Sequence, residues 1–360
     1  MQLNLWFFCF FKSKVIGNSA KYSRKDVKKE NIMKSKFLTL SVIAISSTLF
    51  LGGCGSTEPQ GEAGIERPFL IGLAQLSEHT ALDQSRIGFE AAISDFVEET
   101  GMLVEIDFQN AQGDIATLST IAQRFVNNNV DVIHSIATAT TLAMAQETSI
   151  IPIVGGSISD YISPGFAISN EAPGHNITGT SALMPIERQI HMLLEFLPET
   201  QVIGIGFSSS EPNAVFQAGV AREIIEGLGL TVIEGTVTNV NDISQVLTNL
   251  ANQVDALWIP TDNNFATAFD LVVQISRETN TPLFNSDSVF TMRGAFAGLG
   301  IEWYALGRMA AAQVIDILLD RGEPSTMPIH FPTEFSYVVN REAIEFFGIT
   351  VPERFVDYIQ

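Results

Sequence analysis

Hydroxyl, amide and carboxylate side chains gather in short polar segments, each of which follows an apolar run of the chain. These segments are rich in Ser, Thr, Asn, Asp and Gly and span residues 75–83, 110–114, 137–141, 155–160, 208–213, 261–264 and 285–288. Their side chains can donate and accept hydrogen bonds and can pair with a charged group. Each residue taken alone is equally well explained as a helix cap or a turn former. Together, the segments could bind a small polar ligand.

The residues that usually carry catalysis or bind metals lack the required spacing. No cysteine follows Cys54 to act as a thiol nucleophile. The run Ser208-Ser209-Ser210 lacks the G-x-S-x-G pattern, and Gly204-Ile205-Gly206 lacks the third glycine of a dinucleotide loop. The histidines show no metal-ligand spacing, and we expect them at the surface or at helix caps: His79, His134, His175, His191 and His330. We therefore predict a protein that is not an enzyme, with no catalytic residue, metal or cofactor.

Apolar runs of strand length alternate with segments of helical periodicity from Pro68 onward. A first series predicts strands at 69–74, 104–108, 130–133 and 151–154 and helices at 82–99, 115–127 and 140–147. A second series predicts strands at 202–207, 230–237, 256–259 and 283–284 and helices at 186–197, 213–228, 243–253 and 266–278. A helix at 302–320, a strand at 335–339 and a terminal helix follow. This alternation is typical of parallel α/β units, so the predicted fold class is α/β.

The two series predict two doubly wound parallel-sheet lobes joined by a hinge. The late helix and the late strand are left over, and we expect them to cross back to opposite lobes. The first lobe is then predicted to comprise residues 67–183 and 290–330, and the second residues 184–289 and 331–360. Ligands of open α/β sheets bind beyond the carboxyl ends of the strands, where loop amides and helix N-termini converge. The polar segments lie at these positions.

The start of the chain contains a pattern typical of a cleaved lipoprotein signal. Residues 33–53 combine a basic start, a short apolar run and the small residues Gly52 and Gly53, followed by Cys54. The apolar run is shorter than the roughly 20 residues that a membrane helix needs. We expect Cys54 to carry the lipid rather than to be a buried thiol, and residues 54–66 to form a flexible tether. Residues 1–32 precede this signal, and we interpret them as a non-native upstream extension.

The charge of the chain excludes nucleic acid as a partner. The segment after Cys54 contains 11 arginines, no lysine and 38 acidic residues, which gives a formal net charge of −27. Nucleic-acid binding requires a basic surface. The acidic residues are dispersed along the sequence, which is typical of a solvated surface rather than an acidic tail. With Cys54 as the last cysteine, no disulfide can form within the segment that follows it.

Several short sequence motifs in the polar segments resemble those of the tryptophan/tyrosine-type ABC transporter substrate-binding family, which has a type I periplasmic-binding fold. The specific ones are Asp107-Phe108-Gln109-Asn110-Ala111-Gln112-Gly113-Asp114 and Pro260-Thr261-Asp262-Asn263. Further matches include Glu78-His79-Thr80-Ala81-Leu82-Asp83, Asn176-Ile177-Thr178-Gly179 and Ser209-Ser210-Glu211-Pro212-Asn213. Leu51-Gly52-Gly53-Cys54 similarly resembles a lipobox. The family pattern is altered at Ala182 and Tyr161, which are positions that could resize the pocket.

The resemblance implies a zwitterionic ligand, an aromatic amino acid. Its carboxylate would need hydroxyl or backbone N–H donors, for which Ser135, Thr138, Ala139 and Thr140 are candidates. Its ammonium would need a buried carboxylate, for which we rank Asp287 first, Asp262 second and Glu78 third. The remaining candidate contacts are Gln75, Ser157, Ser209, Glu211, Asn213 and Asn263.

The resemblance also implies a solute-binding lipoprotein on the extracytoplasmic face of a membrane. Its partners would be an ABC permease with its ATPase, the small ligand, and the membrane through acylated Cys54. Two alternatives stay open: import of a nucleoside, sugar or other polar ligand, and ligand sensing for a membrane receptor kinase. A ligand-sensing regulator of the same fold would begin with a DNA-binding helix-turn-helix, where this chain has a signal-like segment.

Overall fold

The first lobe is organised around a parallel five-stranded sheet with strand order β2-β1-β3-β4-β5. The structure is a computed structural model that describes residues 67–360. The expectations for residues 1–32, the signal 33–53, Cys54 and the tether lie outside the described residues. The elements of the first lobe up to β5 are β1 (Phe69–Gln75), α2 (Thr80–Thr100), β2 (Val104–Asn110), α3 (Ile115–Asn127), β3 (Val132–Ile136), α4 (Thr138–Glu147), β4 (Ile153–Ile158) and β5 (Ile177–Ser181).

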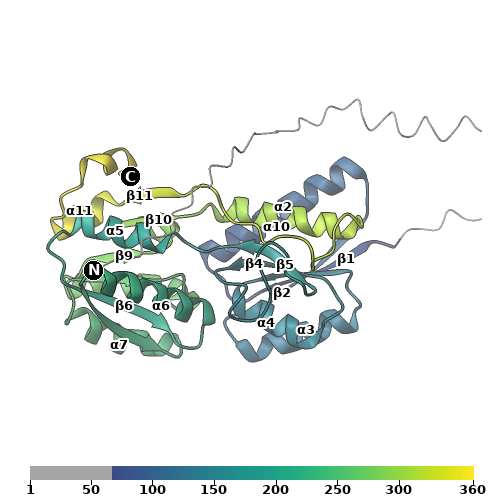
Figure 1. The fold of residues 1–360 in the computed structure, drawn as a ribbon, viewed down its shortest axis with the longest axis horizontal. Helices are drawn as coiled ribbons and strands as arrows, with labels where there is room; N and C mark the ends of the chain where they lie inside the picture. The colour runs from purple at the N-terminus through teal and green to yellow at the C-terminus, as the bar shows by residue number, and fades with distance from the viewer. Residues whose placement is uncertain (1–66) are drawn as a thin grey trace, which may run out of the picture. The chain divides into compact units, whose positions relative to one another are not determined.

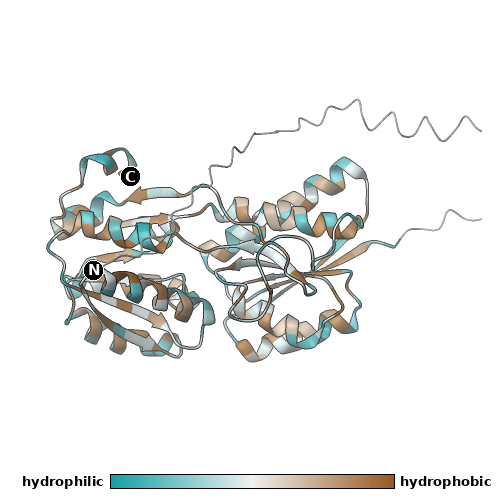
Figure 2. Cartoon of the chain, viewed as in Figure 1, coloured by the Kyte–Doolittle hydropathy of each residue, from teal (hydrophilic) through white to brown (hydrophobic). Residues whose placement is uncertain are grey.

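Helices cover both faces of this first sheet. In Figure 1, α3 and α4 lie against one face, and α2 lies against the other together with the late helix α10 (Trp303–Leu318). Strand β3, at the centre of the sheet, is buried along its whole length, as expected for a strand between two helical layers. Figure 2 shows the resulting concentration of hydrophobic residues along the strands and the inner faces of the helices.

The second lobe has a six-stranded sheet with strand order β11-β10-β9-β8-β6-β7, in which only the β10–β11 pair is antiparallel. Its larger elements are α5 (Ile186–Phe196), β6 (Val202–Ser208), α6 (Pro212–Gly227), β7 (Thr231–Val237), α7 (Ile243–Ala251), β8 (Ala256–Ile259), α9 (Phe269–Glu278), β9 (Leu283–Asn285), β10 (Ala297–Gly300), β11 (Ser336–Val339) and α11 (Arg341–Phe347). Its short helices are η1 (Val240–Asp242), α8 (Asn263–Thr267), η2 (Ser288–Arg293) and η3 (Glu353–Tyr358).

Alternation along β8 divides the second core into two layers. Leu257 and Ile259 pack with residues of α7 and α9, whereas Ala256 and Trp258 pack with residues of α5 and α6. This is the period-2 pattern of a strand with a helical layer on each face. The two-lobe α/β architecture predicted from the sequence is confirmed.

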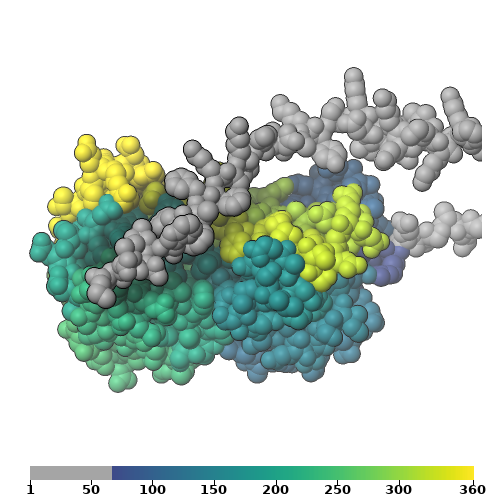
Figure 3. Space-filling model, in the orientation of Figure 1, coloured from purple at the N-terminus to yellow at the C-terminus, as the bar shows by residue number. Residues whose placement is uncertain are grey.

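Helix α10 belongs to the first lobe although it follows the second lobe in sequence. It packs along α2, and Figure 3 shows its yellow-green surface among the blue surfaces of the earliest elements. Two glycines permit this close contact. A Cβ atom on Gly88 of α2 would lie 2.0 Å from the Tyr304 carbonyl oxygen, and a Cβ on Gly307 of α10 would lie 1.8 Å from the Ser85 carbonyl oxygen. The two helix backbones therefore touch where side chains normally keep helices apart.

The chain passes between the lobes at residues 182–185, 301–302 and 331–335. One sequence-based boundary needs correction. We placed residues 290–300 in the first lobe, but they include the end of η2 and strand β10, which pairs with β9 and β11 of the second sheet. The crossing therefore begins after Gly300. Glycines at 298 and 300 hide β10 from sequence analysis because they interrupt the apolar run.

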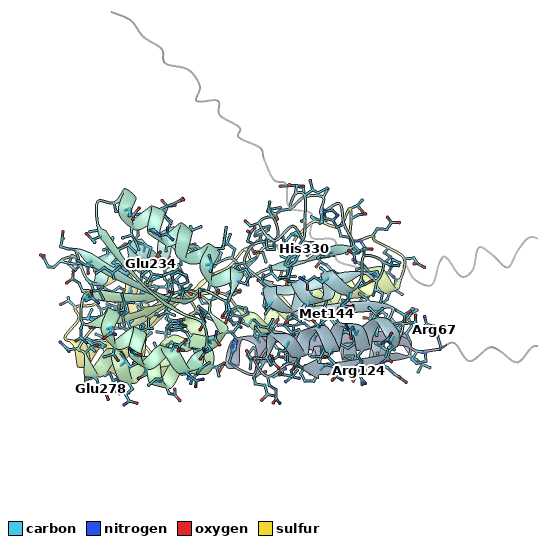
Figure 4. The ribbon with its side chains drawn as sticks, turned by 90° about the horizontal axis from the view of Figure 1, so that it is seen from below. Arg67, Arg124, Met144, Glu234, Glu278 and His330 are labelled. Atoms are coloured by element: carbon cyan, nitrogen blue, oxygen red, sulfur yellow. The ribbon has the colours of Figure 1, made fainter. Side chains whose placement is uncertain are left out.

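The surface is acidic, and most arginines are paired on it. Arg67 bonds Asp131, and Arg124 bonds Asp107, at the surface of the first lobe, whereas Glu234 lies at the surface of the second (Figure 4). Exposed pairs of this kind contribute little to stability, about 0–1 kcal/mol each. None of the helices in residues 67–360 combines the length and the apolarity that a membrane span requires.

Candidate functional site

A pocket between the two lobes collects polar segments that are far apart in the sequence. Its cavity volume is about 30 Å³, so the pocket is narrow in this arrangement of the lobes. The first lobe contributes the loop before α2, the start of α4 and the end of β4, and the second contributes the ends of β8 and β9. The pocket is lined by His79, Ala81, Leu82, Ala137, Ser157, Asn213, Pro260, Thr261, Asp262, Asn263, Phe265, Ala266, Asn285, Asp287, Phe290 and Trp303.

Asp287 is a buried carboxylate in the wall of this pocket. It is 2% exposed and caps η2, where one of its oxygens accepts a hydrogen bond from Val289 N (3.1 Å). Burial raises the pKa of Asp287 to about 6. The buried indole N–H of Trp303 pulls this pKa the other way, although it does not reach hydrogen-bond geometry. Among residues 67–360, no basic side chain forms an ion pair with Asp287. A cationic ligand group would meet a carboxylate with free acceptor capacity.

Asp262 has more of its hydrogen-bonding capacity committed to the fold. It caps α8 by accepting from Phe265 N (3.0 Å), and it accepts two further bonds from the backbone and hydroxyl of Ser208 (2.6 and 2.9 Å). Burial raises its pKa. Burial and the nearby Asp262 carboxylate also raise the pKa of Glu211, so the two acids hold a proton more readily than isolated carboxyls. These contacts favour Asp287 over Asp262 as the ammonium partner.

The first lobe contributes hydroxyl groups at the start of α4. The residue before the helix, Ala137, has a φ of 87°, an unusual conformation for a non-glycine residue. The hydroxyls of Thr138 and Thr140 are buried and have no partner among the described residues, whereas Ser135 bonds Thr141 (2.7 Å). Unpaired donors beside a helix N-terminus suit an anionic ligand group. These hydroxyls belong to the lobe opposite Asp287, but neither threonine lines the pocket itself, and Thr138 lines a separate cavity.

Two side-chain hydrogen bonds join the lobes around the pocket. His79 Nε2 and Asn263 Oδ1 are 3.0 Å apart, and Gln217 Nε2 donates to Ser159 Oγ at 2.9 Å. All four side chains come from segments at the carboxyl ends of strands or the helices that follow. The lobes are therefore in contact, with the pocket enclosed between them.

The structure brings together some of the candidate residues and separates others. Those lining the pocket are Ser157, Asn213, Asp262, Asn263 and Asp287. Thr138, Ala139 and Thr140 are buried in the first turn of α4, Ser135 is buried in β3, and Ser209 is exposed outside the pocket. Glu78 and Glu211 line an adjacent groove. Gln75 is buried and donates to Asp83 (2.8 Å) and to the Ser77 carbonyl (2.7 Å), so its amide orders the loop before α2.

Apolar pocket residues were missed in the sequence. Phe265 and Phe290 closely follow polar segments, but their apolar character makes them look like ordinary core positions, and Trp303 follows no polar segment. His79 was expected at the surface or at a cap. It does precede α2, but its side chain forms no cap bond and lines the pocket. A polar segment closely followed by an aromatic residue is the signal that could have identified Phe265 and Phe290.

The expectation for His134 was wrong. This histidine is fully buried in the first core, where its ring stacks on Phe89 with 4.2 Å between centroids. Its Nδ1 is 2.8 Å from the Val154 carbonyl oxygen, and burial lowers its pKa to about 4. Because a neutral imidazole with one satisfied nitrogen can pack like an aromatic ring, a histidine inside an apolar strand is compatible with the core.

Several known proteins are similar to this chain in fold and in sequence. The ABC transporter substrate binding protein family matches residues 70–359. A tyrosine-binding protein of Clostridioides difficile (strain R20291) is 27% identical over 320 residues, covering 87% of this chain and 92% of that protein. An ABC domain from Streptococcus pneumonia, solved in complex with L-Trp, is 28% identical with a TM-score of 0.77, covering 82% of this chain and 100% of that one.

A third relative was solved in a ligand-free, open form. It is a substrate binding protein with adhesive properties from Clostridium difficile, 31% identical with a TM-score of 0.62, covering 81% of this chain and 98% of that one. The present structure is thus closer in shape to the tryptophan complex than to the open form, in agreement with its joined lobes. These likenesses confirm the resemblance found in the polar segments. The chain belongs to the ABC transporter substrate binding protein family.

Proposed function

We propose that this chain binds an aromatic amino acid between its lobes and delivers it to an ABC permease and its ATPase on the extracytoplasmic face of the membrane. The observation that carries the proposal is Asp287, a buried carboxylate without an ionic partner among the described residues, in a pocket that also contains Phe265, Phe290 and Trp303. A ligand ammonium would complete the charge pair, and the aromatic walls would bury an apolar side chain.

The opposite end of the ligand has suitable partners on the first lobe. The unpaired hydroxyls of Thr138 and Thr140 and the first-turn amides of α4 can donate to a carboxylate. The relatives add support, because one is named for tyrosine and another was solved with L-Trp. The Asp287 carboxylate belongs to one lobe and the hydrogen-bond donors of α4 to the other. A zwitterion that contacts both groups would therefore stabilise the arrangement in which the lobes touch.

Asp287→Asn tests the ammonium contact. We expect the substitution to weaken binding of the preferred amino acid by roughly 2 to 5 kcal/mol, the range for removing one partner of a buried charge pair. Calorimetric titration with Trp, Tyr and Phe measures this directly. The ligand-induced rise in melting temperature should shrink in parallel, since that rise follows ligand affinity.

Two controls make the result specific. Asp95→Asn removes an exposed carboxylate, which bonds only Arg308 at the surface, and should leave affinity unchanged. Indole-3-propionate, which lacks the ammonium, should bind the parent protein weakly and lose nothing further in Asp287→Asn. If Asp287→Asn binds the amino acids as tightly as the parent, Asp287 is a cap residue only and the proposed binding mode is wrong.

We also propose that Cys54 is acylated and anchors the protein to the membrane. The support is the signal-like segment 33–53 that ends at Gly52-Gly53-Cys54, together with the family assignment. Cys54→Ala should give a protein that is released or left unprocessed and that binds ligand normally. Cell fractionation and mass spectrometry of the amino terminus would show it; a processed, membrane-bound variant contradicts the proposal.

A further inference from the structure

Glu211 fixes the orientation of the neighbouring Asn263 side chain. The Glu211 carboxylate is 3% exposed, and its two oxygens accept hydrogen bonds from the backbone N–H groups of Asn264 (3.1 Å) and Asn263 (3.0 Å) at the start of α8. The amide nitrogen of the Asn263 side chain donates to the same Glu211 Oε2 at 2.6 Å. In the structure the Asn263 side chain turns its NH₂ group toward Glu211 and its oxygen away, which is the only orientation that an ionised carboxylate accepts.

That amide oxygen determines which ring nitrogen of His79 carries hydrogen. Asn263 Oδ1 lies 3.0 Å from His79 Nε2, and an amide oxygen can only accept, so Nε2 must donate. Burial lowers the pKa of His79, which keeps the ring neutral near pH 7. A neutral imidazole has one N–H, and it is already committed to Asn263. The other nitrogen, Nδ1, therefore has a free lone pair.

His79 Nδ1 is an acceptor without a partner among the described residues. The atom is buried, and His79 lines the pocket beside Phe290, with 6.1 Å between their ring centroids. A buried polar atom without a hydrogen bond is unfavourable, because it has lost its contacts with water and gained none in return. A ligand that brings a donor to this point recovers that cost, and a ligand without one leaves it in place.

We propose that His79 is a specificity-determining residue whose Nδ1 accepts a hydrogen bond from the ring of an aromatic amino acid. The pocket then prefers the phenol O–H of tyrosine or the indole N–H of tryptophan to the bare ring of phenylalanine. Asn263 and Glu211 are positioning residues, because they act on the ligand by fixing the His79 tautomer. The inference rests on the proposed function, since it assigns the ammonium to Asp287 and the side chain to the aromatic wall.

The test compares Tyr, Trp and Phe by calorimetric titration of the parent protein and of His79→Phe. The parent should bind Tyr and Trp at least roughly tenfold more tightly than Phe, the value of one good hydrogen bond. In His79→Phe, which retains a ring but no nitrogen, this preference should fall to about threefold or less through weaker Tyr and Trp binding. His191→Phe, at an exposed position of α5, is the matched control and should keep the parent preference.

A second measurement reports the tautomer without any variant in the pocket. In protein labelled with ¹⁵N-histidine, the His79 signals should show hydrogen on Nε2 and a bare Nδ1. Added Tyr or Trp should shift the Nδ1 signal, and added Phe should leave it near its ligand-free position. Hydrogen on Nδ1 in the ligand-free protein overturns the proposal even if His79→Phe fails to fold.

The remaining outcomes separate this inference from the proposed function. Equal binding of all three amino acids by the parent overturns the role of His79 and leaves the aromatic amino acid assignment intact. Equal weakening of all three in His79→Phe, which loss of the lobe-joining bond to Asn263 would produce by itself, leaves the preference unchanged and also overturns it. Failure of all three to bind overturns both proposals.

Discussion

The buried polar residues differ in how much of their hydrogen-bonding capacity is satisfied within the fold. Asp262 accepts three hydrogen bonds within its lobe, whereas Asp287 accepts one bond from Val289 and retains capacity toward the pocket. His134 is satisfied on one nitrogen inside the core. Asp287 and His79 combine unused hydrogen-bonding capacity with a place in the pocket wall, whereas the unpaired Nε2 of His134 lies in the core.

His134 should make stability depend on pH on the acid side. The folded protein keeps this histidine neutral down to about pH 4, whereas the unfolded chain protonates near 6.5. Stability from His134 is therefore complete above pH 6.5 and is lost as pH falls toward 4, by roughly 3 kcal/mol. Urea unfolding at pH 7.5 and 4.5 should show this loss in the parent protein, and His134→Gln should show it reduced.

The parent protein must be compared with His134→Gln because other groups also make stability depend on pH. Burial raises the pKa of Asp287 and of Glu211, which makes folding more favourable as pH falls. His175→Gln changes an exposed histidine and should follow the parent curve. If His134→Gln and the parent lose the same stability between the two pH values, His134 does not contribute to acid sensitivity.

Part of the candidate site could be predicted from single residues. Asn213, Asp262, Asn263 and Asp287 follow strand ends and Ser157 lies near the end of β4, and that position predicted that they lie near one another. Trp303 could not be found this way, because it begins α10 after the chain has crossed between lobes. Ser209 was misleading, since its hydroxyl bonds the Val237 carbonyl at 3.1 Å within its own lobe.

At the scale of elements, the contact between α2 and α10 depends on the absence of two side chains. Gly307→Ala adds a Cβ 1.8 Å from the Ser85 carbonyl oxygen, so the helices must move apart. We expect a loss of about 1–3 kcal/mol in the free energy of unfolding, typical of overpacking. Urea denaturation followed by circular dichroism measures it.

Gly219→Ala in α6 provides a control of opposite sign. No heavy atom lies within 4 Å of the Cβ it would add. Alanine is a better helix former than glycine, so this variant should gain up to about 1 kcal/mol. Equal effects at the two positions would show that helix propensity, rather than the α2–α10 contact, determines the outcome.

Strongly periodic elements were predictable, and short or glycine-containing ones were not. The predicted helix 115–127 matches α3, because its apolar face and the Asp114 cap can both be recognised in the sequence. Strand β5 reads Ile-Thr-Gly-Thr-Ser, and β10 reads Ala-Gly-Leu-Gly, so neither has an apolar run. Both were therefore absent from the expected elements, and their partners in the sheet determine them instead.

At the scale of the whole molecule, closure depends on contacts that no single lobe contains. Ser159→Ala removes the bond that Gln217 Nε2 donates across the lobes, while Nε2 keeps its acceptors within the second lobe, the Asn213 carbonyl and Thr261 Oγ1. We expect about fivefold weaker ligand binding, because losing one hydrogen bond destabilises the closed arrangement by about 1 kcal/mol. Calorimetric titration gives the affinity, and small-angle scattering of the ligand-free protein should show a more open average.

Ser209→Ala is the matched control for that experiment. Its hydroxyl bonds only within the second lobe, so affinity and scattering should both be unchanged. Unchanged affinity in Ser159→Ala would mean that the Gln217 bond follows closure without contributing to it. Reduced affinity with an unaltered scattering profile would place the effect at the pocket rather than at the lobe equilibrium.

The late position of α10 and β11 in the chain has a consequence for how the protein matures. The first lobe is complete only when residues 303–318 have packed against α2. The second sheet is complete only when residues 336–339 have paired with β10. When the chain emerges amino terminus first, neither lobe can be finished until nearly all of it has appeared. We therefore expect a prematurely terminated chain to expose apolar helix and strand faces to proteases, rather than to accumulate as one folded lobe.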